Sequence, residues 1–460
     1  MDRAEIYLEI VMQQPLLLAP IAIFIFAYAL VPSHRRLFVS LMILVPWLTI
    51  ARSPGMGAFS SAAKLTSGIA YILIAYAAWA HPGPKRQIPM LVWLFVAIAI
   101  ISIGYVFTTQ ERMLAIILRM QWVTVTVAGV LTAQTIVRLS DLNRLMNALT
   151  WGCLFALIVP FSALVLFPGE SFLRGMGRFQ PWLANSNQIG MLFALATPLF
   201  AYAAMSWRST LKPLFLSALV LTIAMALLTA SRQTMLAIVL VMLPILLALT
   251  KRPIITVLGL AISFFVFSFI FTLGEAADFE RFSSLQTGRL DIWGAYWTQV
   301  FPSRPIFGLL GTSGESYFKA LTEVGQHPHN AWFYLMYIGG ISIAGPMLYI
   351  TIYSVFSGWK IWRVRKFLPS EPLLYSLLFM ILIAMYIQGL FNQVVYWPTY
   401  TWSFLHVVIA SLFICMYREM RDISFDSILY QDDEEYEYGD YYLDNEEDVS
   451  DEHESHSRTD

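Results

Sequence analysis

Residues 88–107 read IPMLVWLFVAIAIISIGYVF, a run of 20 residues without a charged side chain. A helix of that length is about 30 Å long, which matches the thickness of the hydrocarbon core of a bilayer. Lipid offers no hydrogen-bonding partner, so the backbone groups of such a run have to pair within the segment itself. The stretch therefore predicts a membrane-spanning helix.

Apolar runs of this kind recur along the whole chain. Of all residues, 58% are hydrophobic and only 13% are charged, whereas a soluble domain carries roughly 25% charge. We therefore predict an all-α polytopic membrane protein with about 12–13 transmembrane helices. The expected spans lie near residues 15–32, 37–51, 66–80, 88–107, 120–137, 146–167, 188–204, 213–230, 233–249, 253–273, 331–356, 373–391 and 399–416.

Lys and Arg residues fall in alternate loops between these spans. They are Arg35, Arg36, Lys85, Arg86, Arg138, Arg144, Arg208, Lys212, Lys251, Arg252, Lys360, Arg363, Arg365, Lys366, Arg418 and Arg421. Cytoplasmic loops carry the excess of Lys and Arg, so we expect this side and the carboxyl terminus to face the cytoplasm. The loops at residues 168–187 and 274–330, and the amino terminus, are then expected on the external side.

The last part of the chain has a different composition. From Asp426 onward it holds 15 acidic residues and one basic residue, Arg458, so 28 basic and 15 acidic residues precede this stretch. Low hydrophobicity with high net charge predicts disorder. We expect residues 1–416 to form a transmembrane domain and residues 417–460 to form an acidic, disordered cytoplasmic tail. The tail serves either as a solubilising terminus or as a binding segment for a cytoplasmic partner.

The external side collects the polar residues that are candidates for a functional site. Its loop at residues 274–330 is long, and a loop of this length between spans is uncommon without a function. The candidates on this side are Arg174, Arg178, Asn187, Arg232, Arg289, Trp293, His327 and His329.

Several of these candidates also have a purely structural interpretation. Arg232 suits an interfacial anchor whose guanidinium group reaches the lipid headgroups. Arg289 lies two residues before Asp291, which would serve as an ion-pair partner. Asn187 suits a helix cap, and so do the two histidines together with Asn330. Taken one residue at a time, the sequence leaves both interpretations open.

As a set, the candidates favour the binding of a diphosphate at the external membrane surface. The guanidinium group of arginine donates two parallel hydrogen bonds to phosphate and stays charged at any accessible pH. Preorganised cations stabilise a departing diphosphate without a metal ion. A histidine titrates near neutral pH, so one beside such a site is suited to take a proton from an acceptor hydroxyl.

At these residues the chain resembles the O-antigen ligase and polymerase superfamily of membrane glycosyltransferases, which have a C-type-like architecture. The resemblance rests on an ordered series of short motifs between residues 170 and 350. They are GRFQPWLANSN at 177–187, Ser231-Arg232, Thr287-Gly288-Arg289 with Trp293, PIFGLLG at 305–311, and His329-Asn330 with Leu335. The fourth motif departs from the Pro-x-x-Gly-x-Gly pattern of the family by one extra residue between the glycines.

The resemblance implies an enzyme, its substrates and its location. Members of the superfamily move a glycan from an undecaprenyl-diphosphate carrier to an acceptor hydroxyl on a glycan or lipid. The reaction takes place at the periplasmic face of the bacterial inner membrane and builds O-antigen, lipopolysaccharide or exopolysaccharide. A metal-independent, inverting reaction without a cofactor is implied. The shared motifs do not distinguish a polymerase from a ligase.

The resemblance also implies roles for the candidate residues. By position, Arg232 and Arg289 would hold the carrier diphosphate and neutralise it as it leaves. His329 would orient or deprotonate the acceptor. Further substrate-binding candidates are Arg174, Arg178, Asn187, Trp293 and His327.

A transporter or flippase of lipid-linked glycan is the main alternative. A transport pathway needs polar groups inside the spans, and the apolar runs hold few of them. The most notable are Arg119, Gln121, Gln388 and Asn392. A third hypothesis is a non-catalytic membrane scaffold that recruits partners through its tail. Cys153 and Cys415 lie in apolar runs, so neither a disulfide framework nor a metal site is expected, and no nucleic-acid partner is expected.

Overall fold

The structure of the chain is a computed structural model. It describes residues 28–104, 106, 112–172, 177–207, 210–250, 289–308, 329–368, 371–392 and 400–421, together with residues 9, 12, 13, 22 and 25. The expected tail from residue 422 onward, the expected span at residues 253–273 and most of the expected span at residues 15–32 lie outside the described residues, whereas residues 417–421 of the expected tail belong to a helix.

Helices make up most of the described chain. The long helices are α3 (Ser33–Ala51), α4 (Ala58–Trp79), α5 (Met90–Gly104), α6 (Arg112–Thr135), α7 (Leu139–Leu166), α8 (Ser186–Ser206), α9 (Lys212–Leu228), α10 (Arg232–Thr250), α15 (Ala331–Arg363), α16 (Pro372–Phe391) and α17 (Thr401–Arg421). The short elements are η2 (Pro54–Met56), η4 (Pro181–Leu183), α13 (Arg289–Ala295), η5 (Tyr296–Val300), η6 (Phe301–Ser303) and η7 (Arg365–Phe367).

The prediction of an all-α polytopic membrane protein is confirmed. In the part of the chain that the structure describes, nine helices are long and apolar enough to cross a membrane. The shorter apolar helices α5 and α9 coincide with two further predicted spans. All of the long helices therefore coincide with predicted spans, and the two remaining predictions concern residues at 15–32 and 253–273.

Three helices begin about two turns earlier than the apolar runs predict. Helices α4, α6 and α7 start at residues 58, 112 and 139, instead of near residues 66, 120 and 146. Their first two turns carry polar residues, such as Lys64 in α4 and Asp141 in α7, which a search for apolar runs leaves out. The helices include these turns because each backbone N–H and C=O group near the membrane still needs a partner.

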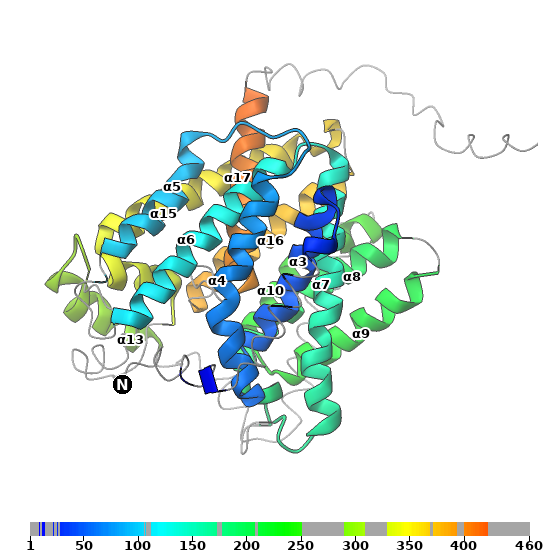
Figure 1. Cartoon of the computed structure of the whole chain (residues 1–460), viewed down its shortest axis with the longest axis horizontal. Coiled ribbons are helices and arrows are strands. Elements are labelled where there is room, and N and C mark those ends of the chain that lie inside the picture. The colour runs from blue at the N-terminus through cyan, green and yellow to red at the C-terminus, as the bar shows by residue number, and fades with distance from the viewer. Residues whose placement is uncertain are drawn as a thin grey trace, which may run out of the picture.

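Helix α17 forms the core of the bundle. Almost all of its residues up to Met416 are buried, and it packs against α6 and α15. Figure 1 shows α5, α6 and α15 on one side of the molecule and α8 and α9 on the other. A helix that is apolar and buried all round is shielded from lipid by its neighbours.

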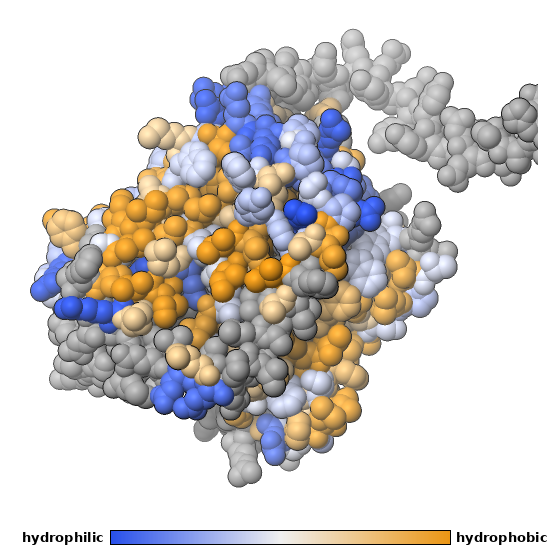
Figure 2. Space-filling model, viewed as in Figure 1, coloured by the Kyte–Doolittle hydropathy of each residue, from blue (hydrophilic) through white to orange (hydrophobic). Residues whose placement is uncertain are grey.

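The bundle has two polar ends separated by apolar surface. Figure 2 shows the apolar surface across the middle of the molecule and hydrophilic surface above it, where α17 ends in Figure 1. We call this the basic end, because Arg86 there pairs with Glu419 of α17. The opposite end contains the first residues of α8, α10, α15 and α17 and the last turn of α16, and we call it the site end. The loops predicted as external lead to the site end.

Helix α15 is broken near the site end, and a loop segment fills the break. Gly340 has non-helical backbone angles, with φ 58° and ψ −152°. The N–H groups of Ile341 and Ser342 donate instead to the carbonyl groups of Pro305 and Ile306, at 2.9 and 3.0 Å. A broken helix is tolerated in a membrane protein only where its backbone groups are paired in this way. Residues 305–308, the described part of the predicted PIFGLLG motif, are therefore docked onto α15.

Replacement of Gly308 by alanine is expected to destabilise this docked segment. Gly308 has a left-handed φ of 64°, and an added Cβ would lie 2.6 Å from the backbone nitrogen of Gly340. Backbone strain and the steric clash together should lower the free energy of unfolding by about 2–5 kcal/mol. Thermal unfolding in detergent measures the change. Gly345→Ala is the control, because a Cβ there makes only an ordinary contact at 3.5 Å, and equal melting temperatures for the two variants would contradict the docking.

Candidate functional site

The loop before α8 is joined to the start of α10 through one asparagine. The Oδ1 atom of Asn187 accepts a hydrogen bond from the guanidinium group of Arg178 at 3.0 Å and another from the hydroxyl group of Ser231 at 2.9 Å. The Nε atom of Arg178 also donates to the carbonyl group of Thr229 at 3.1 Å. Motifs that lie apart in the sequence therefore meet at one point of the site end.

Asn187 is not the cap of α8. The cap is Asn185, whose Oδ1 atom accepts a hydrogen bond from the backbone N–H of Asn187 at 2.9 Å. The interpretation of Asn187 as a helix cap is therefore wrong. Its amide side chain holds Arg178 and Ser231 in place instead.

Arg232 is the first residue of α10, and its side chain is exposed. The chain turns sharply before it, because Ala230 has a left-handed φ of 46° and Ser231 is buried. Helices α8 and α10 pack so closely that a Cβ added to Gly190 would lie 2.0 Å from the Oγ1 atom of Thr234. This close packing fixes the position of the turn that carries Arg232.

The last turn of α16 connects α10 with α15. The Nε2 atom of Gln388 donates to the backbone carbonyl of Gln233. The Nδ2 atom of Asn330 donates to the backbone carbonyl of Leu390 at 3.0 Å. The start of α10 and the turn before α15 are therefore tied to the same end of one helix.

His329 and Asn330 form the turn that opens α15. The predicted capping role of Asn330 is confirmed, because its Oδ1 atom accepts from the N–H groups of Trp332 at 2.8 Å and Phe333 at 3.2 Å. His329 is exposed and has a left-handed φ of 45°. Since the cap fixes the start of the helix, it also fixes the backbone that carries His329.

Arg289 opens α13, and α13 packs on the first turns of α15. The ring centroid of Trp293 lies 5.8 Å from that of Phe333, and the ring centroid of Tyr296 lies 5.1 Å from it. Burial raises the pKa of Tyr296, which agrees with a phenol held between helices. The helix that Arg289 opens is thus held near the turn that carries His329.

Most of the predicted site residues are described, and all of these lie at the site end of the bundle. Arg178 and Asn187 meet at the start of α10, while the segments of Arg232 and His329 meet at α16. Arg174 and His327 lie outside the described residues, and of Arg289 only the backbone is described. Among the described residues, no three His, Cys, Asp or Glu side chains are arranged to hold a metal ion.

Comparison with known proteins assigns this region to a family. A family model described as O-antigen ligase matches residues 217–344, which run from α9 through α10 and α13 to the break in α15. The matched residues include Arg232, Arg289 and His329. This match supports the resemblance of the chain to the O-antigen ligase and polymerase superfamily. No curated protein matches the chain.

The superfamily predicted from the motifs is therefore confirmed. The match supports glycan transfer of the O-antigen ligase or polymerase type by a membrane-embedded protein. We refer to residues 217–344 as the O-antigen ligase domain.

The O-antigen ligase domain and its neighbours bury polar atoms behind Arg232 that the sequence does not assign to the site. The described residues give no hydrogen-bond partner to either side-chain amide atom of Gln233, to the Oγ1 atom of Thr234, to the Oε1 atom of Gln388 or to the Oγ atom of Ser186. Buried polar groups are nearly always satisfied by protein or water. These atoms are therefore suited to bind ordered water or the hydroxyl groups of a substrate. The available signal was an amide side chain within an apolar run, as at position 388.

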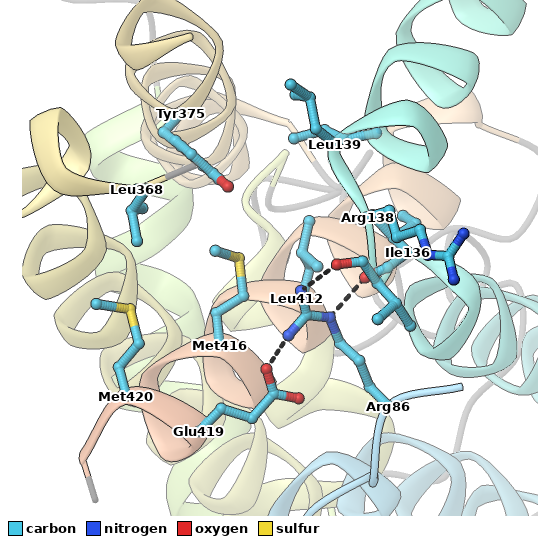
Figure 3. A pocket seen from close by; sticks show the side chains of 12 residues that line it. Arg86, Ile136, Arg138, Leu139, Leu368, Tyr375, Leu412, Met416, Glu419 and Met420 are labelled. Atoms are coloured by element: carbon cyan, nitrogen blue, oxygen red, sulfur yellow. Dashed lines mark hydrogen bonds and ion pairs between the residues drawn. The ribbon is translucent and has the colours of Figure 1, made fainter. Parts of the chain in front are cut away.

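A cavity of about 430 Å³ lies at the basic end of the bundle. Figure 3 shows Arg86 beside Glu419 in this cavity, with dashed lines to Glu419 and to backbone carbonyl groups. The carbonyl groups of Ile136 and Val137 accept its hydrogen bonds at 2.5 and 3.2 Å. None of the predicted site residues lines the cavity, so it is separate from the site end.

Replacement of Asn187 by alanine is expected to lower glycan transfer about tenfold. The variant removes the common acceptor of Arg178 and Ser231, and a lost hydrogen bond to a charged group costs about 1.5–3 kcal/mol. Asn185→Ala is the matched control, because it removes the cap of α8 at a cost of about 0.5–2 kcal/mol without removing this acceptor. Transfer rates per folded protein and melting temperatures are measured for both variants. Equal transfer rates would contradict the positioning role of Asn187.

Proposed function

We propose that this O-antigen ligase superfamily member transfers a glycan from an undecaprenyl-diphosphate carrier to an acceptor hydroxyl, as a polymerase or ligase of surface polysaccharide. One observation supports the proposal most directly. The start of α10 and the turn before α15, which carry Arg232 and His329, are both tied to the last turn of α16. The helix that Arg289 opens packs on the same turns of α15.

The proposed reaction is a single displacement at the anomeric carbon of the donor. The acceptor oxygen forms a bond to this carbon on the face opposite the diphosphate, and the bond from the carbon to the diphosphate oxygen breaks. The electron pair leaves with the diphosphate, whose charge Arg232 and Arg289 neutralise. The proton of the acceptor hydroxyl passes to His329. Attack from the opposite face inverts the configuration, and the residues named supply this chemistry without a metal ion.

The proposed orientation places the basic end in the cytoplasm and the site end at the periplasmic face of the bacterial inner membrane. The excess of Lys and Arg at the basic end supports it. The carrier lipid lies in the bilayer, so its diphosphate lies at the membrane surface. Arg232 and His329 are exposed at the site end, where they can reach such a group.

Reconstitution into proteoliposomes tests this function. The vesicles receive undecaprenyl-diphosphate-linked glycan together with an acceptor glycan or an acceptor lipid. We expect released undecaprenyl diphosphate in an amount equal to the new glycosidic bonds, both measured by mass spectrometry. A ladder of products identifies a polymerase, and a single addition identifies a ligase. Movement of the glycan across the bilayer without a new bond would contradict the proposal and support the flippase alternative.

A further inference from the structure

Arg119 is a buried cation that the proposed reaction does not use. It lies seven residues, or about 10 Å, after the first residue of α6, and only 6% of its surface is exposed. An anchor that reaches the lipid headgroups would keep its guanidinium group accessible, so burial excludes that role for Arg119. An ionisable residue inside a membrane span is costly and is usually functional.

Arg119 lacks the partners that other arginines of this chain have. Among the described residues, no carboxylate pairs with it and no group accepts a hydrogen bond from it. Arg86, by comparison, pairs with Glu419 and donates to two carbonyl groups. A buried charge without a compensating partner lowers the stability of a fold. Its presence is explained most simply by an anion that arrives with a ligand.

The position of Arg119 relates it to the site end. Its electrostatic partner is the hydroxyl group of Tyr334 in α15. The N–H group of Tyr334 donates to the carbonyl of Asn330 at 3.0 Å, so Tyr334 lies one helical turn below the turn that carries His329. Figure 1 shows the first turns of α6 at the same side of the molecule as α13. Arg119 is therefore on the membrane side of the proposed active site.

Two further helices contact both α6, which carries Arg119, and α15. Helices α5 and α17 each pack against both α6 and α15. Arg119 in α6 and Tyr334 in α15 interact electrostatically between these neighbours.

We propose that Arg119 is a further substrate-binding residue, which holds the lipid-proximal phosphate of an isoprenoid diphosphate together with the hydroxyl group of Tyr334. The guanidinium group donates two parallel hydrogen bonds to this phosphate, and the phenol donates one. Arg232 and Arg289 then hold the sugar-proximal phosphate nearer the surface. The inference rests on the proposed function for the identity of the anion.

The test measures equilibrium binding of farnesyl diphosphate to the full-length protein in detergent micelles. Arg119→Met removes the charge at similar volume, and we expect it to weaken binding about tenfold to a hundredfold. Arg119→Lys keeps the charge but loses the planar fork, so its affinity should lie between those of Arg119→Met and the wild type. Arg144→Gln, which removes an exposed guanidinium group at the basic end, should bind as the wild type does.

A second measurement separates a binding role from a structural one. Because no carboxylate among the described residues pairs with the buried Arg119, Arg119→Met should leave the melting temperature unchanged or raise it. A lower melting temperature with unchanged affinity would overturn the inference. So would weakened binding of phosphatidylglycerol with unchanged affinity for farnesyl diphosphate. If Arg119→Met does not fold, an affinity of Arg119→Lys equal to that of the wild type overturns it.

The two proposals fail in distinguishable ways. If the wild type binds farnesyl diphosphate through Arg119 but forms no glycosidic bond in proteoliposomes, the proposed function fails and the binding site stands. If the wild type transfers glycan while Arg119→Met binds with full affinity, the inference fails and the function stands.

Discussion

Alanine at Arg232 or at Arg289 is expected to lower the rate of glycan transfer by about a hundredfold to a thousandfold. Each substitution removes a cation that neutralises the departing diphosphate, and the loss of one preorganised group of this kind typically has an effect of that size. The measurement is the initial rate of undecaprenyl diphosphate release in proteoliposomes, normalised to inserted protein. Cells with either variant should lack the surface glycan although the protein is still inserted in the membrane.

A matched control separates this role from a general need for positive charge. Arg304 is exposed in the same external loop, and Arg304→Ala should retain most of the transfer rate. Lysine at position 232 keeps the charge but loses the bidentate geometry, so it should restore only part of the rate. Normal surface polysaccharide with both alanine variants would remove the assignment of these arginines.

The imidazole of His329 is expected to contribute about a hundredfold to ten-thousandfold to the rate, as positioned general bases do. Asparagine is the suitable replacement, because residue 329 has a left-handed φ of 45° and asparagine tolerates this conformation better than alanine does. His329→Asn should therefore fold normally, bind the lipid-linked donor as tightly as the wild type and transfer glycan much more slowly.

The control for His329 lies at the other end of the bundle. His34 is exposed near the start of α3, and His34→Asn should leave transfer unchanged. Wild-type transfer by His329→Asn would exclude a role for this residue as the base. A loss of donor affinity equal to the loss of rate would instead assign His329 to donor binding.

Much of the fold could be predicted from the sequence because lipid leaves the backbone few choices. A long run without charge, such as residues 88–107, has to be a helix in a bilayer, and α5 occupies this run. The errors lie at helix ends that carry polar residues, such as Lys64 in α4. There the helix continues because its backbone N–H and C=O groups need hydrogen-bond partners, which hydropathy does not measure.

Less of the candidate site could be predicted, because its geometry depends on contacts between distant segments. The motifs identified which residues to examine, but a motif cannot show that Asn187 binds Arg178 and Ser231 while Asn185 caps α8. Both asparagines lie in the same short segment and are suited to either role. The polar residues Gln233 and Gln388 likewise gain significance only when α10 and α16 are seen to meet.

The sequence also could not predict that the loop segment docks onto α15. Gly339 and Gly340 indicate a weak point within an apolar span, but not what lies against it. The contact with Pro305 and Ile306 joins residues more than 30 positions apart. Local sequence patterns carry no information on such a pairing.

A cryo-electron microscopy map of the protein with bound undecaprenyl diphosphate tests the central claim most directly. We expect density for the diphosphate at the site end, in contact with the guanidinium groups of Arg232 and Arg289 and with the imidazole of His329 within reach of the sugar-bearing phosphate. Diphosphate density elsewhere, for example in the cavity beside Arg86 at the basic end, would contradict the account.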